Sequence, residues 1–272
     1  MLSDHDPRRV RRAIAREGLS LLAHGLLLPF GTRRTAPQPE RRRDTRTLVF
    51  VHGLAANRSG FLPMQMYLRV HGHRRQVAVS HRSADSIEAL ALRLKREIDE
   101  LVHGGRIDVV AHSMGGLVAR FYLQQLGGAR RVDRLITLGT PHLGTHAATF
   151  VPSALVRQLL PEGPFIRHLN ALPPPEGVQV TSLVAGRDLL VQPVDSARCP
   201  FGEALHFDDL GHVELLFRPA VFSEVHSILR APVTTASVPE STSGRAVPPP
   251  RRERASLRRG RAREAPGTSA DW

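Results

Sequence analysis

The chain has 272 residues, of which 41% are hydrophobic and 5% aromatic. A chain of this length and composition can bury one full-sized core, so we expect one folded domain with appended segments rather than two domains. The single cysteine, Cys199, excludes an intramolecular disulfide and argues against a cysteine-based metal site.

The formal net charge of +13 is concentrated at the two ends of the chain. Residues 1–45 hold 10 Arg against 5 acidic residues, and residues 231–272 hold 8 Arg against 4, which leaves +4 for the rest. Residues 231–272 are rich in Arg, Pro and Ser without apolar periodicity, which predicts a disordered tail. The tail arginines could contact RNA or anionic lipid, but without interleaved aromatic residues we favour a solvated tail and expect no specific nucleic-acid partner.

Residues 1–45 form a basic and amphipathic N-terminal segment and linker, with the linker at 35–46. The apolar run of this segment, 19–30, follows a group of arginines. This order resembles a secretory signal, but Glu17 interrupts the junction and Arg33 and Arg34 follow where a cleavage site should lie. The run is also too short to cross a bilayer. Two alternatives stay open, namely a segment on an anionic membrane surface and a segment packed on the adjacent domain. We therefore predict a cytoplasmic protein without a cleaved signal peptide, with peripheral membrane contact as one alternative.

The most informative stretch runs from Ile107 to Gly116. A β-branched apolar run turns at Ser113 directly into an amphipathic series, which predicts a buried strand, one tight turn and a helix. Such a turn is typical of a nucleophile elbow, which needs small residues two before and two after the serine. Ala111 and Gly115 occupy these positions, with alanine in place of the usual first glycine. The alternative is a serine that only caps the helix.

A second candidate element of the same site follows the predicted strand 47–51. Gly53 allows a sharp turn after this strand, so the backbone N–H of Leu54 is a candidate oxyanion donor opposite the N–H of Met114. The helix that begins at Met114 also directs its positive dipole end at the turn. We expect His52 to support the loop. The alternative is an ordinary strand-to-loop turn.

Strands and helices alternate along the chain without a hairpin signal. This order predicts an α/β fold with a mostly parallel central sheet and helices on both faces. Asp85 and Glu88 resemble a capping box at the start of a helix that ends before Gly104. Binding sites in such sheets lie at the carboxyl ends of the strands, where Leu54 and Ser113 both fall. We predict strands at 47–51, 76–80, 107–112, 134–138, 178–184 and 204–207, and helices at 61–70, 87–102, 114–126 and 220–229.

Three segments, 51–54, 111–116 and 138–144, together resemble the α/β-hydrolase fold, specifically the bacterial triacylglycerol lipase and esterase branch. The resemblance covers residues 46–230, which it implies to be the catalytic domain. It also implies that residues 146–177 form a small helical cap over an acyl pocket, although ordinary crossover packing would give the same apolar stripe. By this resemblance His142 lines or braces the site and is not a triad member.

A catalytic serine needs a base and an acid that orients it. Asp188 follows the predicted strand 178–184, and by resemblance an acid in this position completes the triad, with Asp195 as the fallback. His212 follows a glycine in the loop after the last strand, from which its ring can reach Ser113. The chain order Ser113, Asp188, His212 is the order found in this fold.

These residues predict a serine carboxylester hydrolase, a lipase or esterase that acts on an ester or lipid small molecule through an acyl-enzyme. An acyltransferase with the same triad and a non-catalytic binding module with the same fold are the alternatives. We expect no metal and no organic cofactor, because the histidines lack ligand spacing and no H-E-x-x-H occurs.

Overall fold

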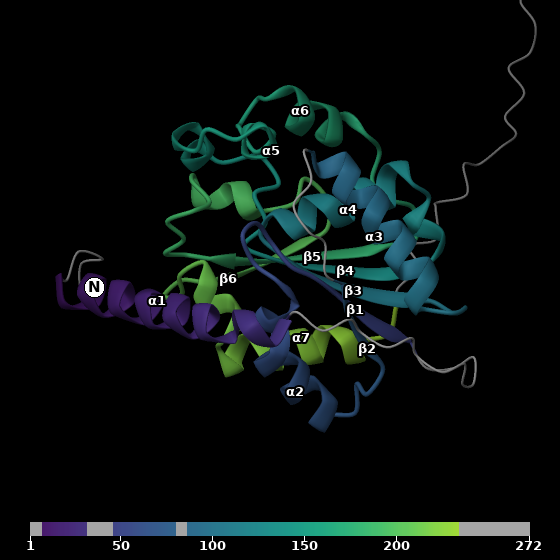
Figure 1. Ribbon diagram of the computed structural model, residues 1–272, viewed down its shortest axis with the longest axis horizontal. Coiled ribbons are helices and arrows are strands. Elements are labelled where there is room, and N and C mark those ends of the chain that lie inside the picture. Colours follow the sequence, from purple (N-terminus) through teal and green to yellow (C-terminus); the bar gives the residue numbers. More distant parts are fainter. Residues whose placement is uncertain (1–6, 32–45, 80–85, 234–272) are drawn as a thin grey trace, which may run out of the picture. The chain divides into compact units, whose positions relative to one another are not determined.

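The computed structural model describes residues 7–31, 46–79 and 86–233. Its centre is a parallel sheet of six strands in the order β2-β1-β3-β4-β5-β6 (Figure 1). The α/β architecture predicted from the alternation of elements is therefore confirmed, and every strand pair within the sheet is parallel. The strands are β1 (Thr47–Val51), β2 (Gln76–Val79), β3 (Ile107–His112), β4 (Val132–Leu138), β5 (Gln179–Ala185) and β6 (Glu203–Phe207).

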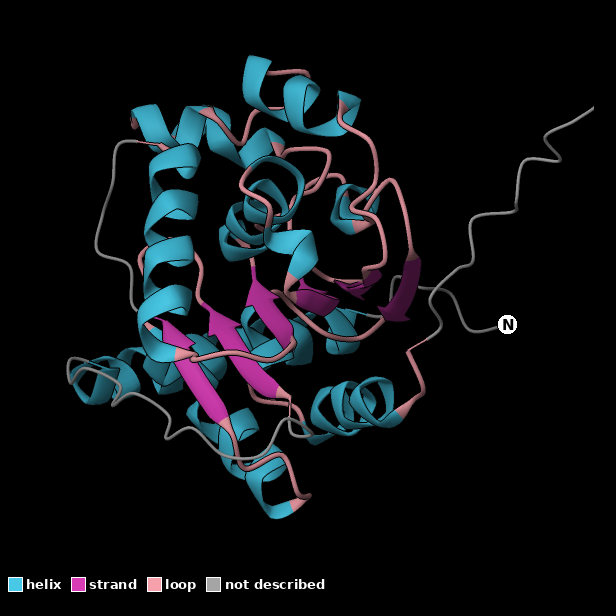
Figure 2. Cartoon of the chain, turned by 90° about the vertical axis from the view of Figure 1, so that its right-hand side faces the viewer, coloured by secondary structure: helices cyan, strands magenta, loops and turns pink. Residues whose placement is uncertain are grey.

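Helices cover both faces of this sheet, as Figures 1 and 2 show. One face carries α3 and α4, with α5 and α6 beyond them, and the opposite face carries α2 and α7. The helices are α1 (Pro7–Leu27), α2 (Leu62–Val70), α3 (Ile87–Leu101), α4 (Met114–Gln125), α5 (Ala154–Arg157), α6 (Pro164–Ala171) and α7 (Pro219–Arg230).

The central strands are apolar on both sides because each side faces a different part of the core. In β1, Val49 and Val51 belong to the cluster beneath α3 and α4, whereas Leu48 and Phe50 belong to the cluster beneath α2 and α7. Side chains alternate across a strand, so a strand covered on both faces needs a continuous apolar run. This is why β1 reads as unbroken hydrophobic sequence.

The start of α3 differs from the predicted capping box. Ser86 is the N-cap, and its hydroxyl accepts a hydrogen bond from the N–H of Ala89. Asp85, the predicted cap, lies outside the described residues. Both residue types are good caps, so the sequence could not separate two candidates one position apart.

The N-terminal segment packs on the sheet domain through its helix. α1 contacts the short 3₁₀ helix η6 (Val213–Leu216), and η1 (Leu28–Gly31) contacts η2 (Arg58–Phe61). Asn57 fixes the second contact by donating from Nδ2 to the carbonyl oxygen of Leu28 at 2.7 Å. The predicted linker and disordered tail fall almost entirely outside the described residues. Across the described part of the chain, no helix has the length and apolar character required to cross a membrane.

We predict that Leu94→Ala lowers the free energy of unfolding by about 2–5 kcal/mol, because it leaves a cavity in the core beneath α3. Leu92→Ala is the matched control, since Leu92 lies on the same helix with its side chain exposed. Urea unfolding of both variants measures the difference. Equal losses in the two variants would contradict the assignment of the buried face of α3.

Candidate active site

Ser113 lies at the turn between β3 and α4, with φ 55° and ψ −133°. A positive φ is costly for a residue with a side chain, so the surrounding structure must hold it in place. Two hydrogen bonds do this: the N–H of Ser113 donates to the carbonyl oxygen of Leu138 at 2.9 Å, and Thr140 Oγ1 donates to the carbonyl oxygen of Ser113, also at 2.9 Å. The strained turn presents the serine at the carboxyl edge of the sheet.

Gly115 permits this turn by allowing close approach of the backbone. A side chain at Gly115 would place its Cβ 2.5 Å from the carbonyl oxygens of Val51 and His52, which is well inside van der Waals contact. The start of α4 is therefore pressed against the end of β1. This contact brings the Leu54 loop beside Ser113 and gives a physical reason for the small residue expected two positions after the serine.

Asp188 and His212 form a buried hydrogen-bonded pair. His212 Nδ1 lies 2.6 Å from Asp188 Oδ2, and both side chains are almost fully excluded from solvent. The second carboxylate oxygen of Asp188 accepts the N–H groups of Leu190 and Val191, each at 2.8 Å. The loop thus fixes the carboxylate through Oδ1, and Oδ2 faces the imidazole. This arrangement sets the orientation of the ring.

Gly139 makes room for this pair. Its φ is 54°, and a Cβ on it would lie 3.0 Å from His212 Nδ1 and 3.3 Å from Asp188 Oδ2. A larger residue at the end of β4 would therefore crowd both side chains. Glycine fits this position for two reasons: it tolerates the positive φ, and it has no side chain that would collide with His212 and Asp188.

His112 contacts His212, a role that its sequence pattern does not predict. It ends β3, its ring centroid lies 4.7 Å from that of His212, and its Nε2 donates to the carbonyl oxygen of His212 at 3.3 Å. Burial, followed by the nearby His212, holds the pKa of His112 well below its ordinary value. A neutral ring with its proton on Nε2 can donate this bond. Its place directly before the serine was the available signal.

α1 supplies a second set of contacts to the His212 loop. Glu17 accepts the N–H groups of Val213 and Glu214 at 2.8 and 3.1 Å, and Arg16 pairs with the buried carboxylate of Glu214 at 3.1 Å. Burial raises the pKa of Glu17, although the two backbone donors oppose that shift. In the sequence Glu17 is only a charge that interrupts a signal-like segment, and nothing nearby reveals a partner almost 200 residues away.

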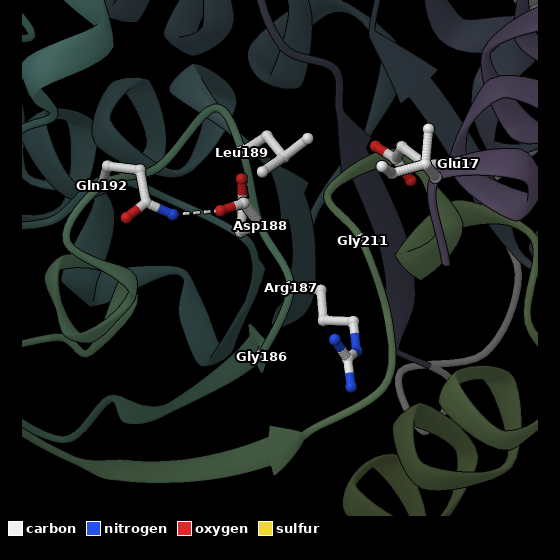
Figure 3. Close-up of a pocket in the computed structure, with 8 residues that line it drawn as sticks. Glu17, Gly186, Arg187, Asp188, Leu189, Gln192 and Gly211 are labelled. Atoms are coloured by element: carbon white, nitrogen blue, oxygen red, sulfur yellow. Dashed lines mark hydrogen bonds between the residues drawn. The ribbon is translucent and has the colours of Figure 1, made fainter. Parts of the chain in front are cut away.

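Two cavities border these residues. One, of about 320 Å³, lies between α1 and the Asp188 loop, and Figure 3 shows Glu17 at one side of it across from Asp188 and Leu189. The other, of about 370 Å³, contains the predicted site, because Ser113, His212 and Leu54 all line it. The rest of its wall is mainly apolar and includes Ala148, Val151, Val156 and Leu159 from the predicted cap and Leu21 from α1.

The remaining predicted residues divide into those near the cavity and those behind it. Met114 is the first residue of α4, so its N–H has no acceptor within the helix. His52 is buried beside the turn, with Nδ1 3.0 Å from the carbonyl oxygen of Gly53. Asp195, the fallback acid, is exposed and pairs with Arg198 at 4.0 Å, so the structure brings Asp188 and not Asp195 to His212.

His142 is fully buried and does not line the cavity that contains Ser113. Its Nε2 lies 3.0 Å from Thr137 Oγ1, and Arg120 Nη1 lies 3.4 Å from its Nδ1. Asn170, on α6, donates to its carbonyl oxygen at 3.1 Å. Its role as a brace of the site stays a prediction. Among the residues that the structure describes, no three His, Cys, Asp or Glu side chains are grouped so as to hold a metal ion.

A family model described as a domain of unknown function, DUF7379, matches residues 29–159. The mature Bacillus licheniformis lipase BlEst2 is similar at 18% identity and TM-score 0.56, over 73% of this chain and 96% of that protein. Aspergillus fumigatus lipase B is similar at 16% identity and TM-score 0.62, over 76% of this chain and 58% of that one. The product of the Listeria innocua gene lin2722 is similar at 14% identity and TM-score 0.51, over 69% of this chain and 94% of that one. The chain has the α/β-hydrolase fold.

We predict that acid destabilises the fold through its buried histidines. Burial lowers the pKa of both His112 and His142 well below 6.5. As the pH falls below about 6.5, these histidines become protonated in the unfolded chain but stay neutral in the folded chain, so the free energy of unfolding decreases. Each group contributes up to about 1.4 kcal/mol per pH unit in this range. Urea unfolding between about pH 8 and pH 5 measures the slope.

His142→Gln should make this slope shallower, because it removes one group that must stay neutral. His103→Gln is the matched control, since His103 is exposed. A slope in His142→Gln as steep as that in the control would show that His142 does not contribute to the acid sensitivity.

Proposed function

We propose that this chain is a serine carboxylester hydrolase, in which Ser113 is the nucleophile, His212 the general base and Asp188 the acid that orients it. The observation that carries the proposal is the buried 2.6 Å contact between His212 and Asp188, with His212 lining the same cavity as the strained Ser113. The similarity to lipases supports the fold on which this site is built and leaves the chemistry to be tested.

The mechanism follows from the roles of these three groups. His212 Nε2 removes the proton of Ser113 as the hydroxyl oxygen attacks the ester carbonyl, while Nδ1–H donates to Asp188 and stabilises the imidazolium. The N–H groups of Leu54 and Met114 stabilise the oxyanion. His212 then protonates the departing alcohol, and a water molecule, deprotonated by the same imidazole, hydrolyses the acyl-enzyme.

The cavity favours an ester with an apolar acyl group. A volume of about 370 Å³ with a mainly apolar wall accommodates a small lipid chain, and burial of such a chain supplies binding energy of about 0.8 kcal/mol per methylene. Cap residues Val156 and Leu159 form part of this wall. We therefore propose medium-chain acyl esters or lipid esters as the substrate class.

Nitrophenyl esters of increasing chain length test this function. We predict that Ser113→Ala lowers kcat/KM at least about 10³-fold and that Asp188→Asn lowers kcat by a similar factor, because the imidazole loses its orienting carboxylate. Asp195→Asn is the matched control, and it should retain wild-type activity because Asp195 is exposed and outside the site.

A fluorophosphonate probe gives a second readout, since it should modify Ser113 in the folded wild type. An unmodified Ser113 in the folded protein would contradict the hydrolase proposal and would favour the alternative of a non-catalytic binding module. Transfer of the acyl group to an added alcohol in preference to water would indicate an acyltransferase. A rate that falls steeply beyond short acyl groups would remove the lipid-ester substrate class.

We also predict that Glu17 is a positioning residue for His212. Glu17→Gln keeps the shape of the side chain but leaves only one acceptor for the two N–H groups of Val213 and Glu214. We expect kcat/KM for a soluble ester and the rate of fluorophosphonate labelling to fall about tenfold, with KM little changed. Unchanged labelling in a folded Glu17→Gln protein would assign Glu17 to stability alone.

A further inference from the structure

The outward face of α1 is apolar over almost four turns. Its side chains at Ile14, Leu19, Leu21, Leu22 and Leu26 are between 52% and 67% exposed, and we call these five residues the outer face of α1. The other exposed positions between them are alanine and glycine. A stretch of exposed large apolar side chains of this extent marks an interaction surface.

The charged residues of this part of α1 point toward the protein. Arg16 and Glu17 are the only charged residues from 14 to 27, and both are bound to the His212 loop. His24 also faces the domain, with its ring edge-on to Phe217 at 6.4 Å. A surface helix usually turns its apolar face to the core, so the orientation of α1 is the reverse of that expected for a helix exposed to water.

The outer face continues around the mouth of the candidate active site. Ile14 and Leu189 line one cavity, and Leu21 and Leu190 line the cavity that contains Ser113. Leu189 and Leu190 are themselves more than half exposed. Whatever covers the outer face of α1 therefore also lies against the entrance to this cavity.

The segments of the chain that the structure does not describe contain few large apolar residues with which to cover this face. Residues 32–45 and 80–85 contain no Leu, Ile, Val, Met, Phe or Trp, residues 1–6 contain only Met1 and Leu2, and residues 234–272 contain four such residues, widely separated. The sequence just before the outer face instead carries arginines at positions 8, 9, 11 and 12. A basic stretch that adjoins an apolar helix face in the sequence is typical of segments that bind anionic lipid, because positive charge is attracted to the headgroups while apolar side chains enter the acyl boundary.

We propose that the outer face of α1 docks on an anionic lipid surface and holds the mouth of the Ser113 cavity against it. Docking itself needs no catalysis. Delivery of an ester lipid from that surface to Ser113 rests on the proposed function. The polar side of the helix stays fixed to the His212 loop through Arg16 and Glu17, so the helix can bind lipid without leaving the domain.

Sedimentation of the full chain with vesicles tests the proposal. Vesicles of phosphatidylcholine mixed with phosphatidylglycerol should bind the wild type, and the combined variant Leu19→Gln, Leu22→Gln and Leu26→Gln should bind at least about tenfold more weakly. These three leucines line neither cavity, and glutamine keeps a high helix propensity. The matched control replaces three other exposed apolar residues, Met66, Val70 and Leu92, with glutamine and should bind like the wild type.

Binding should also weaken on pure phosphatidylcholine vesicles and at high salt, because the arginines contribute through charge. Equal binding by the two triple variants would overturn the proposal. Wild-type protein that forms dimers without lipid, and that the leucine variant converts to monomers, would assign the outer face to a second copy of the chain and would also overturn it.

The two proposals fail separately. Ser113→Ala should bind vesicles like the wild type while it hydrolyses nothing. The leucine variant should hydrolyse a soluble nitrophenyl ester at the wild-type rate while it loses activity on esters embedded in vesicles. A wild type that binds vesicles but cleaves no ester would remove the hydrolase function and leave the docking surface.

Discussion

The buried contact between His212 and Asp188 requires space, hydrogen-bond donors for the carboxylate and a fixed position of the His212 backbone, and the surrounding residues supply all three. The two groups come from loops after adjacent parallel strands, β5 and β6, so they meet only because both strands end at the same edge of the sheet. A buried carboxylate is costly unless its oxygens are bonded, and the N–H groups of Leu190 and Val191 satisfy the oxygen that the imidazole does not use. Gly139 leaves the space, and His112 holds the backbone of His212.

Local sequence predicted the fold well because its main signals are short-range. The unbroken apolar run of β1, the helical spacing in α3 and the change from strand to helix at Ser113 each lie within a few residues. The parallel sheet then follows, since strands separated by helices cannot pair as hairpins. The N-cap of α3 was misplaced because Asp85 and Ser86 are equally good candidates by residue type.

The site was predictable to the extent that it depends on strand ends. Ser113, Asp188 and His212 each follow a strand, and the sheet brings such positions together. The contacts of Glu17 and Glu214 could not be predicted, because they join segments distant in the chain and leave no periodic signal. The orientation of α1 was hidden for a similar reason: composition showed a basic and apolar segment, but only the contacts of Arg16 and Glu17 decide which side faces water.

The attachment of α1 to η6 also has a consequence for the order of folding. Glu17 and the backbone N–H of Val213 are 196 positions apart, so α1 leaves the ribosome long before its partner loop is made. Until then the partners that Arg16 and Glu17 contact in the folded chain do not exist. The contacts between α1 and the His212 loop can therefore form only after Val213 and Glu214 have been translated.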